Sequence, residues 1–317
     1  MERILVTGAN GQLGRCIMDQ VKIINSRNEW FFTDVIDDNE TTYLDLLDEA
    51  EIDKFISDNK ITIIINCAAY TNVDKAENDY ENAEAVNAIG PSYLARSAKK
   101  YNLKSLIHIS TDYVFNGQTF LAYTEDRMTL PMTTYGKTKR MGEQYIEESG
   151  CNYLIFRTAW LYSEYGNNFV KTMLRLFNEK DELNVVNDQI GTPTYAGNLA
   201  KFIVDLVECM TPLEEKKTIP LLENGIYHFT DEGVASWYDF AYFVLCCYEK
   251  YQFKAHPDQF KTVKMNGIRT KDYGSKTKRP FFSLLDKTKL KTDFKGLYEP
   301  RNWMVSVDRV VYKLINQ

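Results

Sequence analysis

The sequence contains no long hydrophobic run and no recognisable leader segment. No stretch of eighteen apolar residues occurs in its 317 residues, and the chain passes from Met1 directly into an expected strand. A membrane-spanning helix needs about 20 apolar residues, and a secretory signal peptide needs an apolar segment behind a basic N-terminus. We therefore expect no membrane partner and a cytoplasmic protein.

A C-x-x-C motif and a strong net charge are also absent. The six cysteines are scattered and form no C-x-x-C pair: Cys16, Cys67, Cys151, Cys209, Cys246 and Cys247. This distribution suits buried thiols in a reducing compartment, so we assign neither a disulfide nor a metal site. The formal net charge of -6 argues against a nucleic acid or an anionic membrane as the main partner, because both attract clustered Lys and Arg.

Ordered globular structure is indicated by what the chain does contain. The apolar fraction is 44% and the aromatic fraction 13%, and there is neither an internal repeat nor a low-complexity tract. A chain of 317 residues can bury a large core and still carry a smaller second lobe.

Short β-branched segments alternate with helix-length segments through the first half of the chain. The strands are expected at residues 3–7, 30–34, 61–67, 104–110 and 152–157. Repeated strand and helix units need crossover connections, which produce a parallel sheet with helices on both faces. The predicted fold class is therefore α/β: a Rossmann-type doubly wound parallel sheet with a smaller C-terminal lobe.

The pattern is looser after about residue 160. We expect helices at 169–177, 195–209 and 236–251, a strand at 225–229, a surface excursion at 211–220 and loops over 250–278. The predicted division is a dinucleotide-binding domain of residues 1–165 plus roughly 188–224, and a substrate-binding lobe of residues 166–187 and 225–317.

A glycine-rich turn, GANGQLG at residues 8–14, follows the first expected strand. Such a turn lets the backbone approach a pyrophosphate and directs the amides of the next helix at its charge. Asp34 lies twenty residues after Gly14, where a carboxylate can accept a hydrogen bond from a ribose 2′-hydroxyl and favour NADH. Asp34 also suits an ordinary turn at the end of a strand.

Tyr135 and Lys139 are four residues apart, which places both side chains on one face of a helix. A nearby ammonium lowers the pKa of a phenol, and Tyr135 could then protonate a substrate oxygen while a hydride arrives at carbon. With 21 tyrosines in the chain, the spacing alone fits a chance pair on a surface helix equally well. The functional interpretation of this spacing therefore depends on the glycine turn and on the next segment.

The segment ISTDYVF at residues 109–115 closes the fourth expected strand. Ligands bind at this end of such sheets, and a hydroxyl here can hold a reacting carbonyl oxygen. Alternatively, Ser110 or Thr111 caps the helix that follows. His108, in the same strand, is interpreted as a packed core histidine.

Longer strings carry a resemblance to a known family. They are NCAAYTNVDKAE (66–77), STDYVF (110–115), YGKTK (135–139), FRTAWLY (156–162), NNFVKTML (167–174), DQIGTPT (188–194), SWYD (236–239) and RPFFSLL (279–285). Together with GANGQLG they run along nearly the whole chain. In this set the sequence resembles the dTDP-4-dehydrorhamnose reductases, which are extended short-chain dehydrogenases/reductases.

The resemblance implies reduction of the C4 keto group of dTDP-4-dehydro-L-rhamnose by hydride from NADPH or NADH, the last step of dTDP-rhamnose synthesis. It implies that Tyr135 donates the proton, that Lys139 is its partner and a ribose ligand, and that Thr111 tunes the site. The implied cofactor-binding residues are Gly8, Asn10, Gly11, Gln12, Leu13, Gly14, Asp34, Asp45, Leu46, Ala68, Ala69, Tyr70, Thr71, Tyr135 and Lys139. The implied dTDP-sugar-binding residues are Thr111, Asp112, Tyr113, Trp160, Asn168 and Arg279.

Relatives of the family supply two alternatives. Nucleotide-sugar 4,6-dehydratases carry a glutamate where this chain has Tyr113, which favours carbonyl reduction over dehydration. An NAD-dependent nucleotide-sugar epimerase is the second hypothesis. A regulatory subunit of the methionine adenosyltransferase type is the third, and the joint presence of Thr111, Tyr135 and Lys139 argues against it.

Departures from the family pattern limit the prediction. Some members are dimers bridged by magnesium on a glutamate, but Cys16 stands at that position, so we predict no such metal and a monomer or homodimer. The usual paired arginines read Lys278-Arg279, and Phe282 replaces the usual asparagine. Asp34 would repel a 2′-phosphate unless Arg15 offsets it, so we expect use of both nucleotides.

Overall fold

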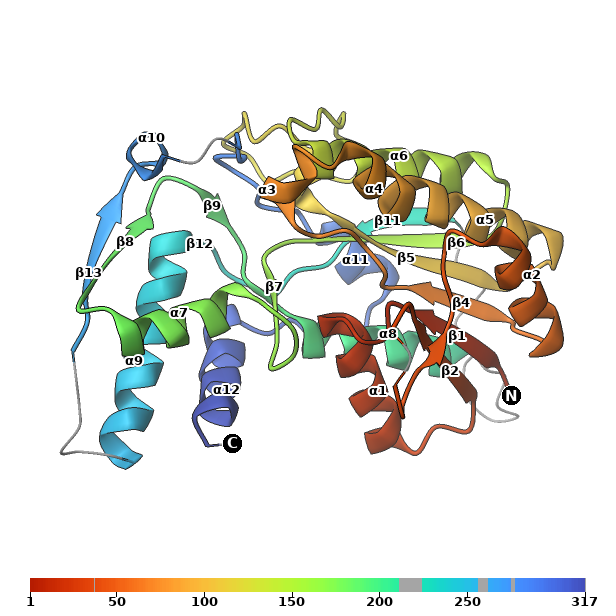
Figure 1. Cartoon of the computed structure of the whole chain (residues 1–317), viewed down its shortest axis with the longest axis horizontal. Helices are drawn as coiled ribbons and strands as arrows, with labels where there is room; N and C mark the ends of the chain where they lie inside the picture. Colours follow the sequence, from red (N-terminus) through yellow and green to blue (C-terminus); the bar gives the residue numbers. More distant parts are fainter. Residues whose placement is uncertain (37, 211–223, 256–261, 275–276, 317) are drawn as a thin grey trace.

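A seven-stranded parallel sheet forms the larger lobe of the computed structural model, which describes residues 1–36, 38–210, 224–255, 262–274 and 277–316 (Figure 1). The strand order is β11-β6-β5-β4-β1-β2-β3. The strands are β1 (Arg3–Thr7), β2 (Glu29–Asp34), β3 (Thr42–Tyr43), β4 (Ile63–Asn66), β5 (Ser105–Thr111), β6 (Tyr153–Thr158) and β11 (Gly225–His228). The predicted α/β class is confirmed, and each of the five strands expected in the first half is present.

Helices cover both faces of this sheet (Figure 1). One face carries α1 (Gln12–Ile24), α8 (Ala196–Met210) and α11 (Thr288–Asp293); the other carries α2 (Glu49–Asp58), α5 (Gly90–Lys100) and α6 (Thr134–Glu148). The short helices α3 (Val73–Ala76) and α4 (Tyr80–Glu84) connect β4 to α5. In β4, Ile63 and Ile65 join the core beneath α1 and α8, whereas Ile64 joins the core beneath α2 and α5. A strand buried on both sides needs apolar residues at every position, which explains the unbroken isoleucine run.

The second lobe is mainly helical. Its helices α7 (Phe169–Glu179), α9 (Trp237–Ala255) and α12 (Trp303–Ile315) pack around an aromatic core that includes Tyr162, Phe240 and Trp303. A parallel pair of strands, β8 (Glu182–Val186) and β13 (Lys264–Ile268), lies at its outer edge (Figure 1). Within the part of the chain that the structure describes, no helix is both long and apolar enough to cross a membrane.

The loops predicted over residues 250–278 are a partial error. Helix α9 continues to Ala255, and β13 and α10 (Thr270–Tyr273) follow it. Strand β13 pairs on one side only and none of its residues is fully buried, so it lacks the apolar alternation by which strands are recognised. The surface excursion predicted over 211–220 lies outside the described residues.

Contrary to the prediction, residues 225–317 do not all belong to the second lobe. Strand β11 pairs with β6 in the large sheet, and Leu290 and Phe294, in and after α11, pack in the core beneath α8. A four-residue strand and a six-residue helix carry no sequence signal of the lobe they join. The lobes are further linked by the short strands β7 (Leu161–Tyr162) with β10 (Thr194–Tyr195) and β9 (Ile190–Gly191) with β12 (Ala235–Ser236).

Candidate active site

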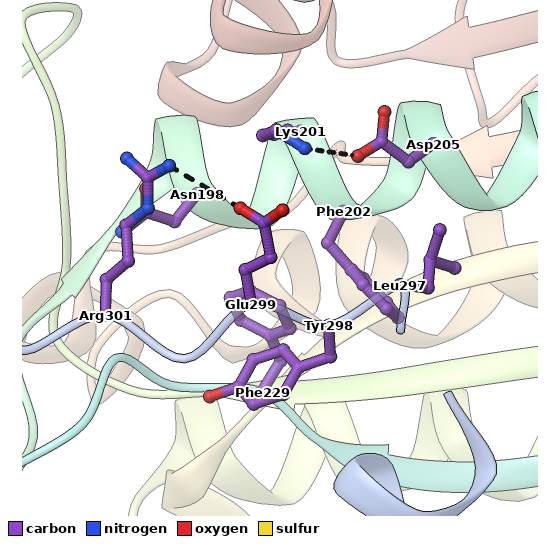
Figure 2. Close-up of a pocket in the computed structure, with 9 residues that line it drawn as sticks. All are labelled: Asn198, Lys201, Phe202, Asp205, Phe229, Leu297, Tyr298, Glu299 and Arg301. Atoms are coloured by element: carbon purple, nitrogen blue, oxygen red, sulfur yellow. Dashed lines mark hydrogen bonds and ion pairs between the residues drawn. The ribbon is translucent and has the colours of Figure 1, made fainter. Parts of the chain in front are cut away.

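A small pocket between α8 and the segment before α12 is too small to be the active site. Figure 2 shows its lining: Asn198, Lys201, Phe202, Asp205, Phe229, Leu297, Tyr298, Glu299 and Arg301. Its volume is about 20 Å³, which is room for one water molecule. Ligands of such folds bind at the carboxyl ends of the sheet strands, and the candidate residues lie there.

The glycine turn between β1 and α1 has the geometry of a phosphate-binding loop. Gly8 adopts a φ of +66°, and a Cβ atom there would lie 2.5 Å from the Cα of Ala68. Gly11 precedes α1 and supplies no side-chain cap, so no side chain covers the first helical amides. Free amides at a helix N-terminus bind anions. The turn therefore fits the pyrophosphate of a dinucleotide.

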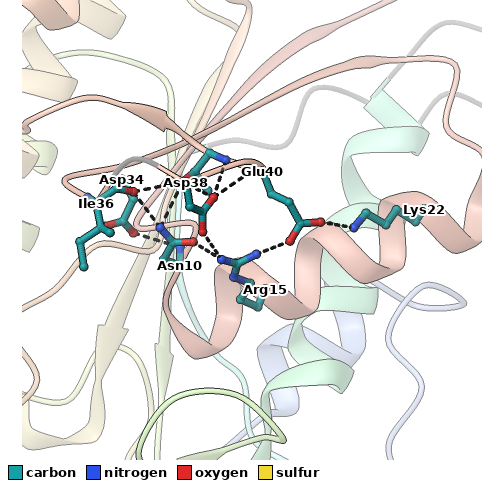
Figure 3. Close-up of polar contacts among 8 residues, drawn as sticks. Asn10, Arg15, Lys22, Asp34, Ile36, Asp38 and Glu40 are labelled. Carbon is teal, nitrogen blue, oxygen red and sulfur yellow. Dashed lines mark hydrogen bonds and ion pairs between the residues drawn. The ribbon is translucent and has the colours of Figure 1, made fainter.

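The carboxylates that follow β2 enclose Arg15, as Figure 3 shows. Asp34 accepts a hydrogen bond from the backbone N–H of Asn10 at 3.0 Å. The Arg15 guanidinium donates to Asp38, Glu40 and the side-chain oxygen of Asn10. Backbone N–H donation from Glu40, with Thr41 and Arg15, lowers the pKa of Asp38, and Lys22 with Arg15 lowers that of Glu40. Both carboxylates are therefore anions that neutralise Arg15.

We expect this enclosure to weaken NADPH binding relative to NADH. The double variant Asp38→Asn with Glu40→Gln should release Arg15 and lower the ratio of the NADPH to the NADH dissociation constant about tenfold. Fluorescence titration of each nucleotide at low ionic strength measures this ratio, because salt screens exposed charges.

The matched control removes two paired carboxylates of the second lobe. Glu179→Gln with Glu182→Gln also removes two negative charges. These two carboxylates, like Asp38 and Glu40, are paired with basic side chains, Arg175 and Lys264. The control should leave the ratio unchanged. An unchanged ratio in the Asp38 and Glu40 variant would show that Arg15 does not discriminate between the nucleotides.

Most of the other residues expected to bind the cofactor can face it mainly through main-chain atoms. The side chains of Leu13 and Leu46 are buried in the two cores of the larger lobe, so only their main chains can face a ligand. Asp45 accepts from the backbone N–H of Leu47 at 2.9 Å. After β4, the chain through Ala68, Ala69, Tyr70 and Thr71 is held by side chains, because Asn66 accepts from Ala68 N–H and Asn87 from Tyr70 N–H.

Thr111 and Tyr135 meet at the carboxyl end of β5. Helix α6 is capped by Thr133, whose hydroxyl accepts from Gly136 N–H at 3.0 Å. A Cβ atom at Gly136 would lie 2.2 Å from the carbonyl oxygen of Tyr113, so only glycine lets α6 begin this close to β5. The Tyr135 and Tyr113 rings contact edge to face at 5.6 Å.

The Tyr135 phenol holds its proton at neutral pH. Burial raises the pKa of Tyr135 to about 12, and the hydrogen bond with the Thr111 hydroxyl opposes this rise only in part. The sequence-based interpretation, in which the Lys139 ammonium lowers this pKa, does not describe the structure. Lys139 Nζ instead donates to the carbonyl oxygen of Ile109 at 2.6 Å, and burial lowers the pKa of Lys139 to about 8. A protonated phenol in this place is suited to donating a proton.

Of the expected sugar-binding residues, Thr111, Asp112 and Tyr113 lie beside Tyr135, and Arg279 lies near Tyr113. Asp112 is buried with its Oδ2 unpaired, and burial raises its pKa to about 6. Arg279 has a buried, unpaired Nε and donates to Asp74 at 2.7 Å. Trp160, held at a φ of +48°, stacks on Trp237 with ring centroids 3.7 Å apart.

Asn168 lies elsewhere than in this group. Its oxygen accepts from Lys171 N–H as the cap of α7, and its nitrogen donates to Gln12 Oε1 at 3.0 Å. Asn168 therefore joins the second lobe to the glycine turn. Among the described residues, no three or more His, Cys, Asp or Glu side chains are grouped so that they could hold a metal ion.

Sequence reasoning missed the polar groups that support the site from behind. Glu143 and Arg157 form a buried ion pair between α6 and β6, with two N–H donations at 2.8 Å. Asn66, which is fully buried, anchors the chain after β4 by accepting from the backbone N–H of Ala68. The available signal was the presence of Asn, His, Arg and Glu in otherwise apolar segments, because buried polar groups need partners.

Comparisons with known proteins identify the family. The family model described as the RmlD substrate binding domain matches residues 1–316. The chain is 39% identical over 310 residues to a dTDP-4-dehydrorhamnose reductase of Aggregatibacter actinomycetemcomitans, covering 98% of each. A solved dTDP-4-dehydrorhamnose reductase of Clostridium acetobutylicum is similar with a TM-score of 0.82 and 37% identity, covering 99% of this chain and 100% of that one. A Bacillus anthracis dTDP-4-dehydrorhamnose reductase, solved in complex with NADP, has a TM-score of 0.82 and 33% identity, covering 98% and 99%. The chain belongs to the RmlD family, the family of the dTDP-4-dehydrorhamnose reductases.

Proposed function

We propose that this protein reduces the C4 keto group of dTDP-4-dehydro-L-rhamnose to give dTDP-L-rhamnose, with NADPH or NADH as hydride donor. The observation that carries the proposal is the protonated, half-buried Tyr135 phenol beside the Thr111 hydroxyl at the carboxyl end of β5. Family membership supports the same reaction.

The reduced dinucleotide, when bound along the glycine turn, supplies the hydride that adds to C4. Tyr135 donates its phenolic proton to O4 as negative charge develops on that oxygen. Thr111 holds O4 by a hydrogen bond and so orients the carbonyl for attack. One hydride and one proton convert the ketone to the alcohol, and the Tyr135 phenolate then regains a proton from solvent.

The second lobe supplies the proposed contacts to the sugar nucleotide. Arg279 offers a cation with an unpaired Nε–H, which suits a diphosphate, because guanidinium donates in a planar fork. Trp160 offers an apolar face beside Trp237, and Asp112 offers an unpaired carboxylate oxygen to a sugar hydroxyl.

We also propose that the enzyme works in the cytoplasm as a monomer or homodimer without a bridging metal. Cys16 is buried in the core beneath α1, and burial raises the pKa of its thiol. A buried neutral thiol is a poor metal ligand, since the thiolate is the form that binds metals.

The decisive experiment is a reductase assay with no added metal. The keto sugar is made in situ by the upstream enzymes, and the loss of reduced-nucleotide absorbance is followed with NADPH and with NADH. We expect turnover with both and dTDP-L-rhamnose as product. Cofactor binding without turnover would contradict the proposal and favour an epimerase or a regulatory role.

A further inference from the structure

A buried chain of polar side chains runs through the sheet from β1 to α6. It consists of Thr7, Asn66, His108 and Lys139, each at most 1% exposed. Strand register places the first three side by side, since Thr7 pairs with Asn66 and Asn66 pairs with His108. The Thr7 hydroxyl lies 2.8 Å from Asn66 Oδ1, Asn66 Nδ2 lies 3.1 Å from His108 Nδ1, and His108 Nε2 lies 3.2 Å from Lys139 Nζ.

Backbone geometry fixes the orientation of the Asn66 amide. The backbone N–H of Ala68 points at one side-chain atom of Asn66 at 3.1 Å. A backbone N–H can only donate, so that atom is the oxygen, and it also accepts from the Thr7 hydroxyl. The amide nitrogen therefore faces His108.

The amide nitrogen in turn fixes the proton of His108. An amide nitrogen can only donate, so His108 Nδ1 must accept and carries no proton. Burial in the sheet lowers the pKa of His108 well below its usual value, so the ring is neutral. A neutral imidazole carries one proton, which is then on Nε2.

The His108 Nε2–H points at Lys139 Nζ. An ammonium has three donors and no acceptor, so this contact is favourable only when Lys139 is a neutral amine. The amine then accepts from His108 and donates to the carbonyl oxygen of Ile109. Of the other groups that act on Lys139, Glu143 on α6 and Cys67 after β4 raise its pKa, but burial outweighs them.

We propose that His108 is a positioning residue for Lys139: with its proton fixed on Nε2 by Asn66, it holds the Lys139 amine against β5 and disfavours the ammonium. Through this chain of hydrogen bonds, residues in the core of the sheet influence the protonation of Lys139. The kinetic consequence rests on the proposed reductase function, whereas the position of the ring proton does not.

The position of the proton is tested directly by NMR of protein labelled with ¹⁵N in the histidine rings. The chain has three histidines, His108, His228 and His256, and the variants His228→Gln and His256→Gln assign the signals. His228 is the internal control, because its Nδ1 lies 3.1 Å from the carbonyl oxygen of Asp286 and must donate. We expect the proton on Nε2 in His108 and on Nδ1 in His228. A His108 ring protonated on Nδ1, or on both nitrogens, would overturn the proposal.

The variant Asn66→Asp tests the effect on Lys139. One carboxylate oxygen can still accept from Thr7 and Ala68. The other replaces the amide nitrogen and can only accept, so the ring proton of His108 should move from Nε2 to Nδ1. Nε2 can then accept from the Lys139 ammonium, and the limb of the kcat/KM profile that depends on Lys139 should move up by about one pH unit, a tenfold change in its proton affinity. An unshifted profile in a folded variant whose ring proton has moved would refute control of Lys139 by His108. If the variant does not fold, the spectrum of the unmodified protein still decides the proton position.

Discussion

Replacing Tyr135 with phenylalanine is expected to lower kcat by about 10²–10⁴-fold, the usual contribution of a positioned general acid. The substitution removes one hydroxyl and keeps the ring that contacts Tyr113. Without the phenol, Asp112 is a poor substitute, because its pKa, raised to about 6 by burial, leaves it mostly ionised at neutral pH. The variant should still bind NADPH and NADH, because the glycine turn is untouched.

Single-turnover rates and nucleotide titrations separate these two effects. The matched control is Tyr113→Phe, which deletes a hydroxyl from the neighbouring ring and leaves the proton donor in place. We expect a much smaller loss for the control. Near-normal turnover by the Tyr135 variant would remove this residue from the mechanism, whereas an equal loss in both variants would indicate that the aromatic contact, and not the proton, matters.

The larger lobe and the location of the site were predictable from the sequence because they depend on local pattern. The isoleucine run of β4 is typical of a strand covered on both faces, and the turn at residues 8–14 is typical of a connection from a strand to a helix. From these, the carboxyl ends of β1, β4 and β5 had to share one edge, which brings Thr111 close to the glycine turn.

Long-range pairing explains what the sequence left undetermined. Strand β13 is recognisable only through its pairing with β8, about eighty residues earlier in the chain. Strand β11 was expected as a strand, but its place beside β6 in the large sheet was not. Protonation states depend on three-dimensional contacts in the same way. The four-residue spacing of Tyr135 and Lys139 suggested a direct effect of one on the other, but the folded chain directs the lysine at His108 instead.

Breaking the buried pair of Glu143 and Arg157 is expected to cost about 3–5 kcal/mol in the free energy of unfolding. Arg157 donates to both carboxylate oxygens at 2.8 Å, and the two side chains are at most 2% exposed. Glu143→Gln leaves the Arg157 cation buried without a counter-charge, and urea denaturation measures the loss. Glu147→Gln, one turn further along α6, is the control, because its pair with Arg140 is partly exposed and should contribute at most about 1 kcal/mol.

The pH dependence of this difference tests the cause. Burial alone would raise the pKa of Glu143, but the hydrogen bonds and charge of Arg157 lower it overall. A carboxylate with a lowered folded pKa stabilises above its unfolded pKa of about 4.3 and loses that contribution as the pH falls through the folded value. The gap in stability between the unmodified protein and the Glu143 variant should therefore be constant above about pH 5 and shrink below about pH 4. A gap that persists in acid would assign the loss to packing. Because α6 also carries Tyr135 and Lys139, the pair that fastens this helix to β6 also holds the proton donor at the end of β5.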